Sequence, residues 1–445
     1  MKKFLIPFLI VLTLPSLAFA DFQSYIGSFV QPTSTGNQSI TGLGFKPKVV
    51  IFWWNAMTAD GSAADATIGL GFAISSSSRQ SVSGSYKNGG TVTNKQGSYR
   101  DRSSVALNLI HNNGAGGVDS YGEADFVSND VGGFTVNWTT VDQVNVGSQP
   151  IVNYLALGGS DITNQYTGAF GSGSTTVTGV GFKPDFLMFI YDDLQGLPPI
   201  TGNTGYQTAW SFIAGTSSQQ TILGDSLDDV PNTDDTFQSP YAMVVMNMNT
   251  IFGTSSIASM NSDGFTFDGG SQRYGQYLAL KGGQYSVGSF NQPTSTGNQS
   301  ITGFGFKPSA TFLSSFNHVA AQDTNPTSWE LSLGGAVSSS SRSSIFTGAG
   351  YNQNPTNSSQ NLDRTNVLKM MVNSSTNPTT NAVADFVSND ASGFTINWTT
   401  ADATQRQVIY ASFGANAAAA ASTSPTSQLS LTGGTLSLGA GTLKL

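Results

Sequence analysis

The chain repeats itself three times, and this internal repetition constrains its fold more than any other feature of the sequence. The segment QPTSTGNQSITGLGFKP at residues 31–47 returns at residues 292–308 with one change, Leu43 against Phe304. A looser copy, TVTGVGFKP, occupies residues 176–184. Each copy later carries a Gly-Phe pair and closes on a short apolar segment. The sequence therefore predicts three related modules in tandem, at residues 21–160, 161–283 and 284–415.

The residues within each copy favour strands over helices. Charged residues make up only 10% of the chain, so the Lys and Glu that surface helices need are scarce. The Gly-Phe segment, as at residues 133–138, alternates Phe, Val and Trp with Thr and Asn, which is the period of a half-buried strand. Several such strands lie between Gly, Ser and Asn turns in each copy. We predict an all-β protein of three tandem antiparallel β-sandwich domains, jelly-roll-like, with little helix beyond a signal peptide.

The two ends of the chain differ from the repeats. Lys2 and Lys3 precede an apolar run, and small residues at Ala18 and Ala20 suit a signal peptidase. We predict a signal peptide at residues 1–20, cleaved after Ala20, and a secreted or cell-surface protein. No later apolar run is long enough for a transmembrane helix. Residues 416–445 combine a low-complexity linker with a strand-like tail, which is either a loosely ordered end or an edge strand for self-association.

The order of motifs within a copy resembles that of known β-sandwich repeats. A Tyr-x-Gly start, a Gly-Phe-x-Pro turn, an apolar strand, a Gly-Phe strand and a closing Tyr-x-Ala strand are similar to repeats of phage tail and virion-associated proteins and of bacterial secreted proteins. The order is also similar to H-type lectin domains, with counterparts at residues 45–49, 133–134 and 154–158. This resemblance implies a β-sandwich fold and a role without catalysis.

Trp53 and Trp54 are the most informative candidates for a binding site. Neighbouring residues of a strand point to opposite faces, so both indoles cannot enter one core. Two interpretations stay open: a strand buried on both faces, or an exposed indole that stacks on a sugar ring or a partner protein. In the second copy, the matching segment carries Tyr191 and Asp192. The predicted ligand-binding residues are Trp53, Trp54, Asn55, Tyr191 and Asp192.

The charged residues argue against several classes of function. Lys and Arg never cluster, so the basic patch of a nucleic-acid-binding protein is missing. The only two histidines and the only two glutamates lie in different copies, and no catalytic motif occurs, so we expect no enzyme and no cofactor. An acidic loop offers oxygen ligands that calcium could use, although its spacing matches no EF-hand. These weak calcium candidates are Asp228, Asp229, Asp234 and Asp235.

Two hypotheses of function follow from these observations. The first is a secreted or cell-surface protein that binds carbohydrate or a surface polymer, like a lectin or adhesin, and uses its three modules for avidity. The second is a structural or assembly protein of a surface layer, a filament or a phage-tail-like particle. The Gly-rich, weakly charged composition and the strand-like tail suit the second hypothesis.

Overall fold

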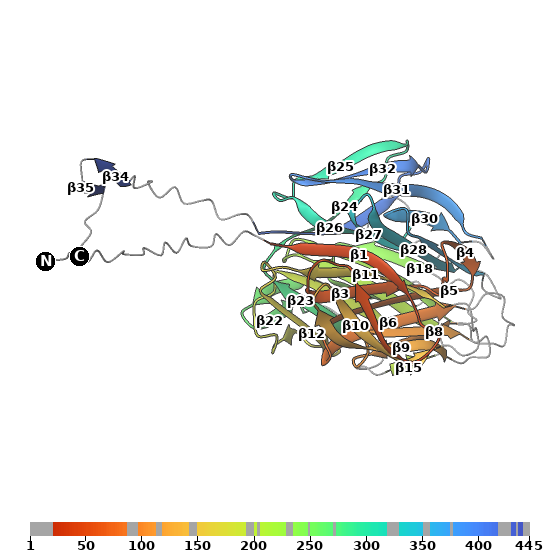
Figure 1. The fold of residues 1–445 in the computed structure, drawn as a ribbon. Coiled ribbons are helices and arrows are strands. Elements are labelled where there is room, and N and C mark those ends of the chain that lie inside the picture. The colour runs from red at the N-terminus through yellow and green to blue at the C-terminus, as the bar shows by residue number, and fades with distance from the viewer. Residues whose placement is uncertain are drawn as a thin grey trace. The chain divides into compact units, whose positions relative to one another are not determined.

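A computed structural model shows that the chain folds as antiparallel β-sheets without helix in its described residues, which confirms the all-β sandwich prediction (Figure 1). Contacts group Asp21–Asn416 into one compact unit, called the body below. The structure describes residues 21–86, 97–112, 118–141, 149–192, 200–202, 205–227, 235–247, 250–269, 273–317, 329–349, 357–373, 377–416, 429–432 and 435–438.

The strands follow the three copies along the chain. Those of the first copy are β1 (Gln23–Val30), β2 (Gly36–Thr41), β3 (Pro47–Trp54), β4 (Gly61–Ala64), β5 (Ala66–Ser75), β6 (Ser78–Tyr86), β7 (Gly97–Arg102), β8 (Leu107–Asn112), β9 (Val118–Asp130), β10 (Gly133–Val141) and β11 (Ile151–Gly158). Those of the second copy are β12 (Asn164–Phe170), β13 (Thr176–Val177), β14 (Phe186–Asp192), β15 (Ile200–Gly202), β16 (Gly205–Ile213), β17 (Gln219–Leu227), β18 (Asp235–Ser239), β19 (Met243–Asn247), β20 (Thr250–Ser255), β21 (Ile257–Asn261), β22 (Gly264–Phe267) and β23 (Gly275–Lys281). Those of the third copy are β24 (Gln284–Asn291), β25 (Gly297–Thr302), β26 (Pro308–Ser315), β27 (Trp329–Ser338), β28 (Ser341–Ala349), β29 (Ser358–Asp363), β30 (Leu368–Val372), β31 (Thr379–Asp390), β32 (Gly393–Thr400) and β33 (Gln407–Gly414).

Each copy builds a large sheet and a smaller set of strands with the same strand order. The large sheets run β1-β11-β3-β5-β6-β7, β12-β23-β14-β16-β17-β18 and β24-β33-β26-β27-β28-β29. The small sheets of the first and third copies run β2-β10-β9-β8 and β25-β32-β31-β30. In the second copy the small layer is divided into β13-β22-β21 and β19-β20. The shared order shows that the three repeats share one fold.

The cores of the copies lie between the large and the small sheet. In the first copy, Phe52 from the large sheet meets Phe134 from the small sheet, with ring centroids 5.7 Å apart. The Trp138 indole is buried there as well, and its Nε1 donates a 2.8 Å hydrogen bond to Gln38. Trp398 and Gln299 repeat this bond in the third copy. The Gly-Phe strand therefore packs its apolar face inward, as its alternation predicts.

The other faces of the three large sheets meet in a common central core. This cluster takes buried side chains from every copy, including Ile51 and Leu155 of the first, Met188 of the second and Phe312 of the third. Residues such as Val50 and Phe52, which alternate with Ile51 along β3, lie instead in the first copy's own core. Central strands of the large sheets, such as β3, β11 and β14, are consequently apolar on both faces and read as nearly continuous apolar runs.

Three equivalent hydrogen bonds show that the copies form a closed ring. Each comes from a serine at the start of β6 or β28 or directly before β17, and each reaches the residue that precedes the glycine in the first strand of another copy. The bonds join Ser78 to Thr167 (2.7 Å), Ser218 to the Val287 carbonyl (2.7 Å) and Ser341 to the Ile26 carbonyl (2.6 Å). The first copy thus contacts the second, the second the third, and the third the first.

Two strands cross from one copy to the sheet of another. β4 of the first copy pairs with β29 of the third, and β15 of the second copy pairs with β7 of the first. Asp60, which precedes β4, forms a two-armed ion pair with Arg364, at 3.0 and 3.1 Å. Main-chain pairing between copies makes the body more than three separate domains in contact.

The chain enters and leaves the body at one place. The Asp161 backbone N–H donates to the Asp21 carbonyl at 3.0 Å, and the Asp161 carboxylate accepts from the Asn416 N–H at 2.9 Å. The predicted signal peptide lies outside the described residues. In the tail, β34 (Leu429–Thr432) and β35 (Thr435–Leu438) pair with each other as an antiparallel hairpin. Among the residues that the structure describes, none form a helix of the length and hydropathy that a membrane crossing takes.

Candidate functional site

Trp53 and Trp54 are both fully buried, each with 0% of its surface exposed. Trp53 points into the central core, where its ring centroid lies 5.2 Å from that of Phe312. Trp54 points into the first copy's own core opposite Gly69, where a Cβ would lie 2.0 Å from the indole. A sugar platform needs an exposed ring, so the structure does not support a binding role for this pair. It has the other arrangement that the sequence left open, a strand buried on both faces.

Asn55 joins two copies instead of facing solvent. Its side chain is fully buried, and Nδ2 donates to the Asn361 carbonyl of β29 at 2.8 Å. Its Oδ1 accepts a 3.2 Å hydrogen bond from the Met57 N–H. Both polar atoms of the amide are therefore used within the body. The side chain that follows Trp53 and Trp54 therefore contributes to a contact between the first and third copies.

The remaining predicted residues do not gather into a site among the described residues. Tyr191 is fully buried, its hydroxyl donates to the Val244 carbonyl at 3.1 Å, and burial raises the pKa of the phenol. Asp192 ends β14, and its side chain lies outside the described residues. Asp235 begins β18 opposite Asp225, and its side chain is likewise not described. The other calcium candidates, Asp228, Asp229 and Asp234, lie outside the described residues, so the calcium site stays a prediction.

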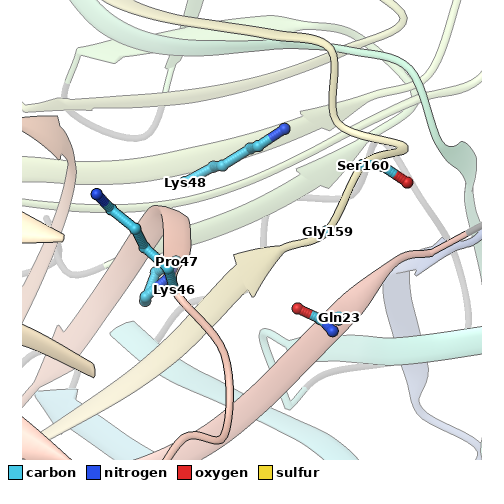
Figure 2. Close-up of a pocket in the computed structure, with 6 residues that line it drawn as sticks. All are labelled: Gln23, Lys46, Pro47, Lys48, Gly159 and Ser160. Carbon is cyan, nitrogen blue, oxygen red and sulfur yellow. The ribbon is translucent and has the colours of Figure 1, made fainter. Parts of the chain in front are cut away.

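The structure places a cleft where three strands of the first copy's large sheet end or begin (Figure 2). Its volume is about 430 Å³, within the range of small-ligand sites. The register brings the strands together, because Gly158 at the end of β11 pairs with Gln23 of β1 and with Pro47 of β3. The cleft is lined by Gln23, Lys46, Pro47, Lys48, Gly159 and Ser160.

Two glycines allow the chain to pass close to the cleft. At Gly158 a Cβ would lie 2.7 Å from the Phe45 ring. Gly159 has a φ of +93°, and a Cβ there would lie 2.1 Å from the Asp21 carbonyl oxygen. Only glycine takes this φ without strain and also admits so close a neighbour. The shape of the cleft is thus fixed by the backbone at its edge.

Two lysines give the cleft its charge. Lys48 is half-buried, and its Nζ donates a 2.6 Å hydrogen bond to the Ile162 carbonyl, which holds the ammonium in place. Lys46 is exposed and extends from the same short segment in Figure 2. Within the described part of the chain, neither lysine is in an ion pair. The arrangement can bind a polar or negatively charged group.

Within the protein, the charge of Lys46 acts on the Asp130 carboxyl. Hydrogen bonds from the hydroxyls of Ser128 and Thr135, both 2.7 Å, hold the pKa of the Asp130 carboxyl below its usual value, and the charge of Lys46 adds a smaller effect. Asp130 is therefore satisfied by its own neighbours. The Lys46 ammonium stays available to solvent and to a ligand.

The other two copies carry different chemistry at the same turn. The second copy has a cleft of about 290 Å³ beside Lys183, Pro184 and Asp185. Asp185 stands where the first copy has Lys48, and its carboxylate accepts from the Gly282 N–H at 2.7 Å. The third copy has Ser309 there, whose carbonyl accepts from the Ser24 hydroxyl at 2.8 Å. Only the first copy presents two lysines at this turn.

Sequence reasoning missed this cleft because it looked for aromatic residues. The available signal was a difference between the copies, like the one that drew attention to Trp53 and Trp54. Three residues after Phe45, Phe182 and Phe306, the copies carry different residues. Lys48 and Asp185 each bond the main chain near the end of their copy, so the change of charge accompanies a change of partner, from the Ile162 carbonyl to the Gly282 N–H. Among the described residues, no group of three or more His, Cys, Asp and Glu side chains could hold a metal ion.

Comparisons with known proteins leave the chain without an assigned family. No family model matches it, and no curated protein matches it. Among solved structures, a fructofuranosidase from Schwanniomyces occidentalis complexed with fructose is 10% identical, with a TM-score of 0.14, and the match covers 91% of this chain and 100% of that chain. The LG1-3 region of the laminin alpha2 chain is 6% identical, with a TM-score of 0.08, and the match covers 88% of this chain and 94% of that chain. Neither similarity bears on the fold or the function.

Proposed function

We propose that this chain is a secreted or cell-surface protein that binds a carbohydrate or another surface polymer without catalysis. The observation that carries the proposal is the cleft at the first Lys-Pro turn. It combines two ammonium groups, an amide from Gln23 and a hydroxyl from Ser160. A few hydrogen-bonding groups that line one cleft suit a sugar unit.

The differences between the copies change the expected stoichiometry. Three equal modules would give three equal sites and strong avidity. The turn of the second copy carries Asp185 and that of the third carries Ser309, so one principal site per chain is expected. Attachment of the chain to a surface, or an oligomer, would then supply multivalency.

A glycan array with the mature chain, residues 21–445, tests this function. We expect binding to a defined set of glycans, and loss of that signal in the double variant Lys46→Ser/Lys48→Ser. Lys183→Ser in the second copy is the matched control and should leave binding unchanged. Absence of any glycan or polymer signal would remove the proposal. A signal that ignores the double variant would remove the cleft as its site.

A second candidate function is a structural role in a surface layer, filament or phage-tail-like particle. The observation that favours it is the antiparallel hairpin that β34 and β35 form. Such a hairpin has edges that can pair with another chain. Deletion of residues 417–445 keeps Asn416, which bonds Asp161, and should abolish assembly in electron micrographs. A full-length protein that sediments as a monomer at high concentration would exclude this role.

A further inference from the structure

The cleft lined by Gln23, Lys46, Pro47, Lys48, Gly159 and Ser160 has two lysines and no carboxylate in its lining. The chain as a whole carries a formal net charge of −8. Its acidic residues outnumber its basic residues, 26 against 18, so a positive site is exceptional on this protein. Two lysines line this cleft, and neither is in an ion pair among the described residues.

The position of Lys48 is fixed before any ligand arrives. A lysine ammonium carries three N–H groups, and one of those of Lys48 donates to the Ile162 carbonyl at 2.6 Å. Two donors remain, held by a side chain that is already half-buried. Preorganisation of this kind lowers the entropy cost of binding, because the lysine has fewer rotamers to lose.

Among the described residues, the carboxylate of Asp161, which follows Ser160, forms no ion pair with either lysine. It is 7% exposed and accepts from the Asn416 N–H. In the second copy the residue at the Lys48 position is Asp185, and it is used by the Gly282 N–H. At this position the first copy thus has a cation, whereas the second copy has an anion and the third has a neutral residue.

From these observations we infer that the cleft recognises a negatively charged group on its ligand, a carboxylate or a sulfate carried by a sugar ring of an acidic polysaccharide. This inference rests on the proposed function and adds the substrate class to it. Lys48 binds the anion, Lys46 adds its positive charge beside it, and Gln23 and Ser160 donate to or accept from ring hydroxyls. A cleft of about 430 Å³ fits one or two sugar units.

Matched polymers separate charge from sugar recognition. The mature chain is titrated calorimetrically with oligogalacturonate and with its methyl ester, which have the same backbone with and without charge. Dextran sulfate and dextran form the second pair. We expect binding to the charged member of one pair, about tenfold weaker or absent binding to its neutral partner, and weakening with added salt. The pair that binds identifies carboxylate or sulfate as the group.

Variants assign the effect to the two lysines. Lys48→Ser should weaken binding roughly tenfold, the loss expected for one charge-assisted hydrogen bond. Lys46→Ser keeps the contact between Lys48 and Ile162, and it should also weaken binding if the charge of the cleft matters. Lys183→Ser is the control. Unchanged thermal unfolding shows that each variant is folded.

The outcomes distinguish this inference from the proposed function. Equal binding of neutral and charged polymers, or wild-type affinity in both lysine variants, overturns the inference and leaves glycan binding standing. No binding to any of the four polymers overturns the inference, and the absence of signal on the glycan array then removes the proposed function as well.

Discussion

At the scale of single residues, the start of each copy and its closing tyrosine form one contact. Tyr154 of β11 lies opposite Gly27 of β1, and a Cβ on Gly27 would lie 2.6 Å from the tyrosine hydroxyl oxygen. The contact recurs in the other copies, between Gly168 and Tyr277 (2.6 Å) and between Gly288 and Tyr410 (2.7 Å). The glycine in the first strand of each copy therefore leaves room for the large tyrosine side chain of the closing strand.

Gly27→Ala tests this reading of the motif. The new methyl must displace the Tyr154 ring, and we expect the free energy of unfolding to fall by about 1–3 kcal/mol. Chemical denaturation measures the change. Gly171→Ala is the matched control, because its Cβ would meet its nearest neighbour, Tyr274, at an ordinary 3.7 Å. Equal stability of the two variants would contradict the argument.

Glu330 is a buried acid in the third copy. It is 2% exposed, and burial raises the pKa of its carboxyl to about 7 despite hydrogen bonds from the Asn373 N–H and the Asn317 amide and the charge of Arg406. The usual value is 4.5. The folded chain therefore holds this proton more tightly than the unfolded chain does.

The free energy of unfolding should consequently fall as the pH rises from about 4.5 to about 7, because the unfolded chain releases the proton first. The loss is roughly 3 kcal/mol from this group alone. Glu330→Gln should remove it, so that the variant gains stability relative to the wild type as the pH increases. Denaturation at several pH values measures the difference. Parallel pH profiles of the two proteins would refute this assignment.

At the scale of elements, β3 has no free face, because all but one of its residues are buried. β3 places Trp53 in the central core and Trp54 in the core of the first copy. Asn55, which follows β3, bonds the main chain of β29. β4 then adds main-chain pairing to the same neighbour. The segment from β3 to β4 is thus one continuous contact between the first and third copies.

Asn55→Ala distinguishes a structural role from a ligand-binding one. The substitution leaves the buried Asn361 carbonyl and the Met57 N–H without their partner, so we expect a loss of about 1–3 kcal/mol in the free energy of unfolding. Polymer binding by the folded variant should not change. Asn37→Ala on an exposed position of β2 is the control and should cost less than about 0.5 kcal/mol. Weaker binding with full stability would restore Asn55 as a ligand contact.

At the scale of the whole molecule, the closed ring couples the three copies. Each copy buries one face of its large sheet only against the other two, so unfolding of one copy would expose the central core of all. We expect the body to unfold in a single cooperative transition, with equal calorimetric and van't Hoff enthalpies. Trp53→Ala should move that transition to lower temperature without splitting it. Two or three resolved transitions in a calorimetric scan would show that the copies unfold independently.

Much of this architecture could be predicted from the sequence, and the missing part has a physical reason. The repeats, the turn glycines and the alternation along the Gly-Phe strand indicate a sandwich, because each is a local property of the chain. The apolar run from Val49 to Trp54 indicates burial on both faces, but it does not say what covers the second face. Another copy, a ligand or a partner would leave the same pattern. The cleft beside Lys48 depends on strand register, which also cannot be read from a local pattern.

The shared anchoring of Asp21 and Asn416 on Asp161 has a consequence for how such a chain can be encoded. Since both ends of the body meet at one residue, a short linker could join them, and the chain could be reopened at another boundary between copies. The ring contacts do not depend on which copy is translated first. A circular permutant that begins at Gln284 should therefore reach the same native fold, with its copies in the order third, first, second.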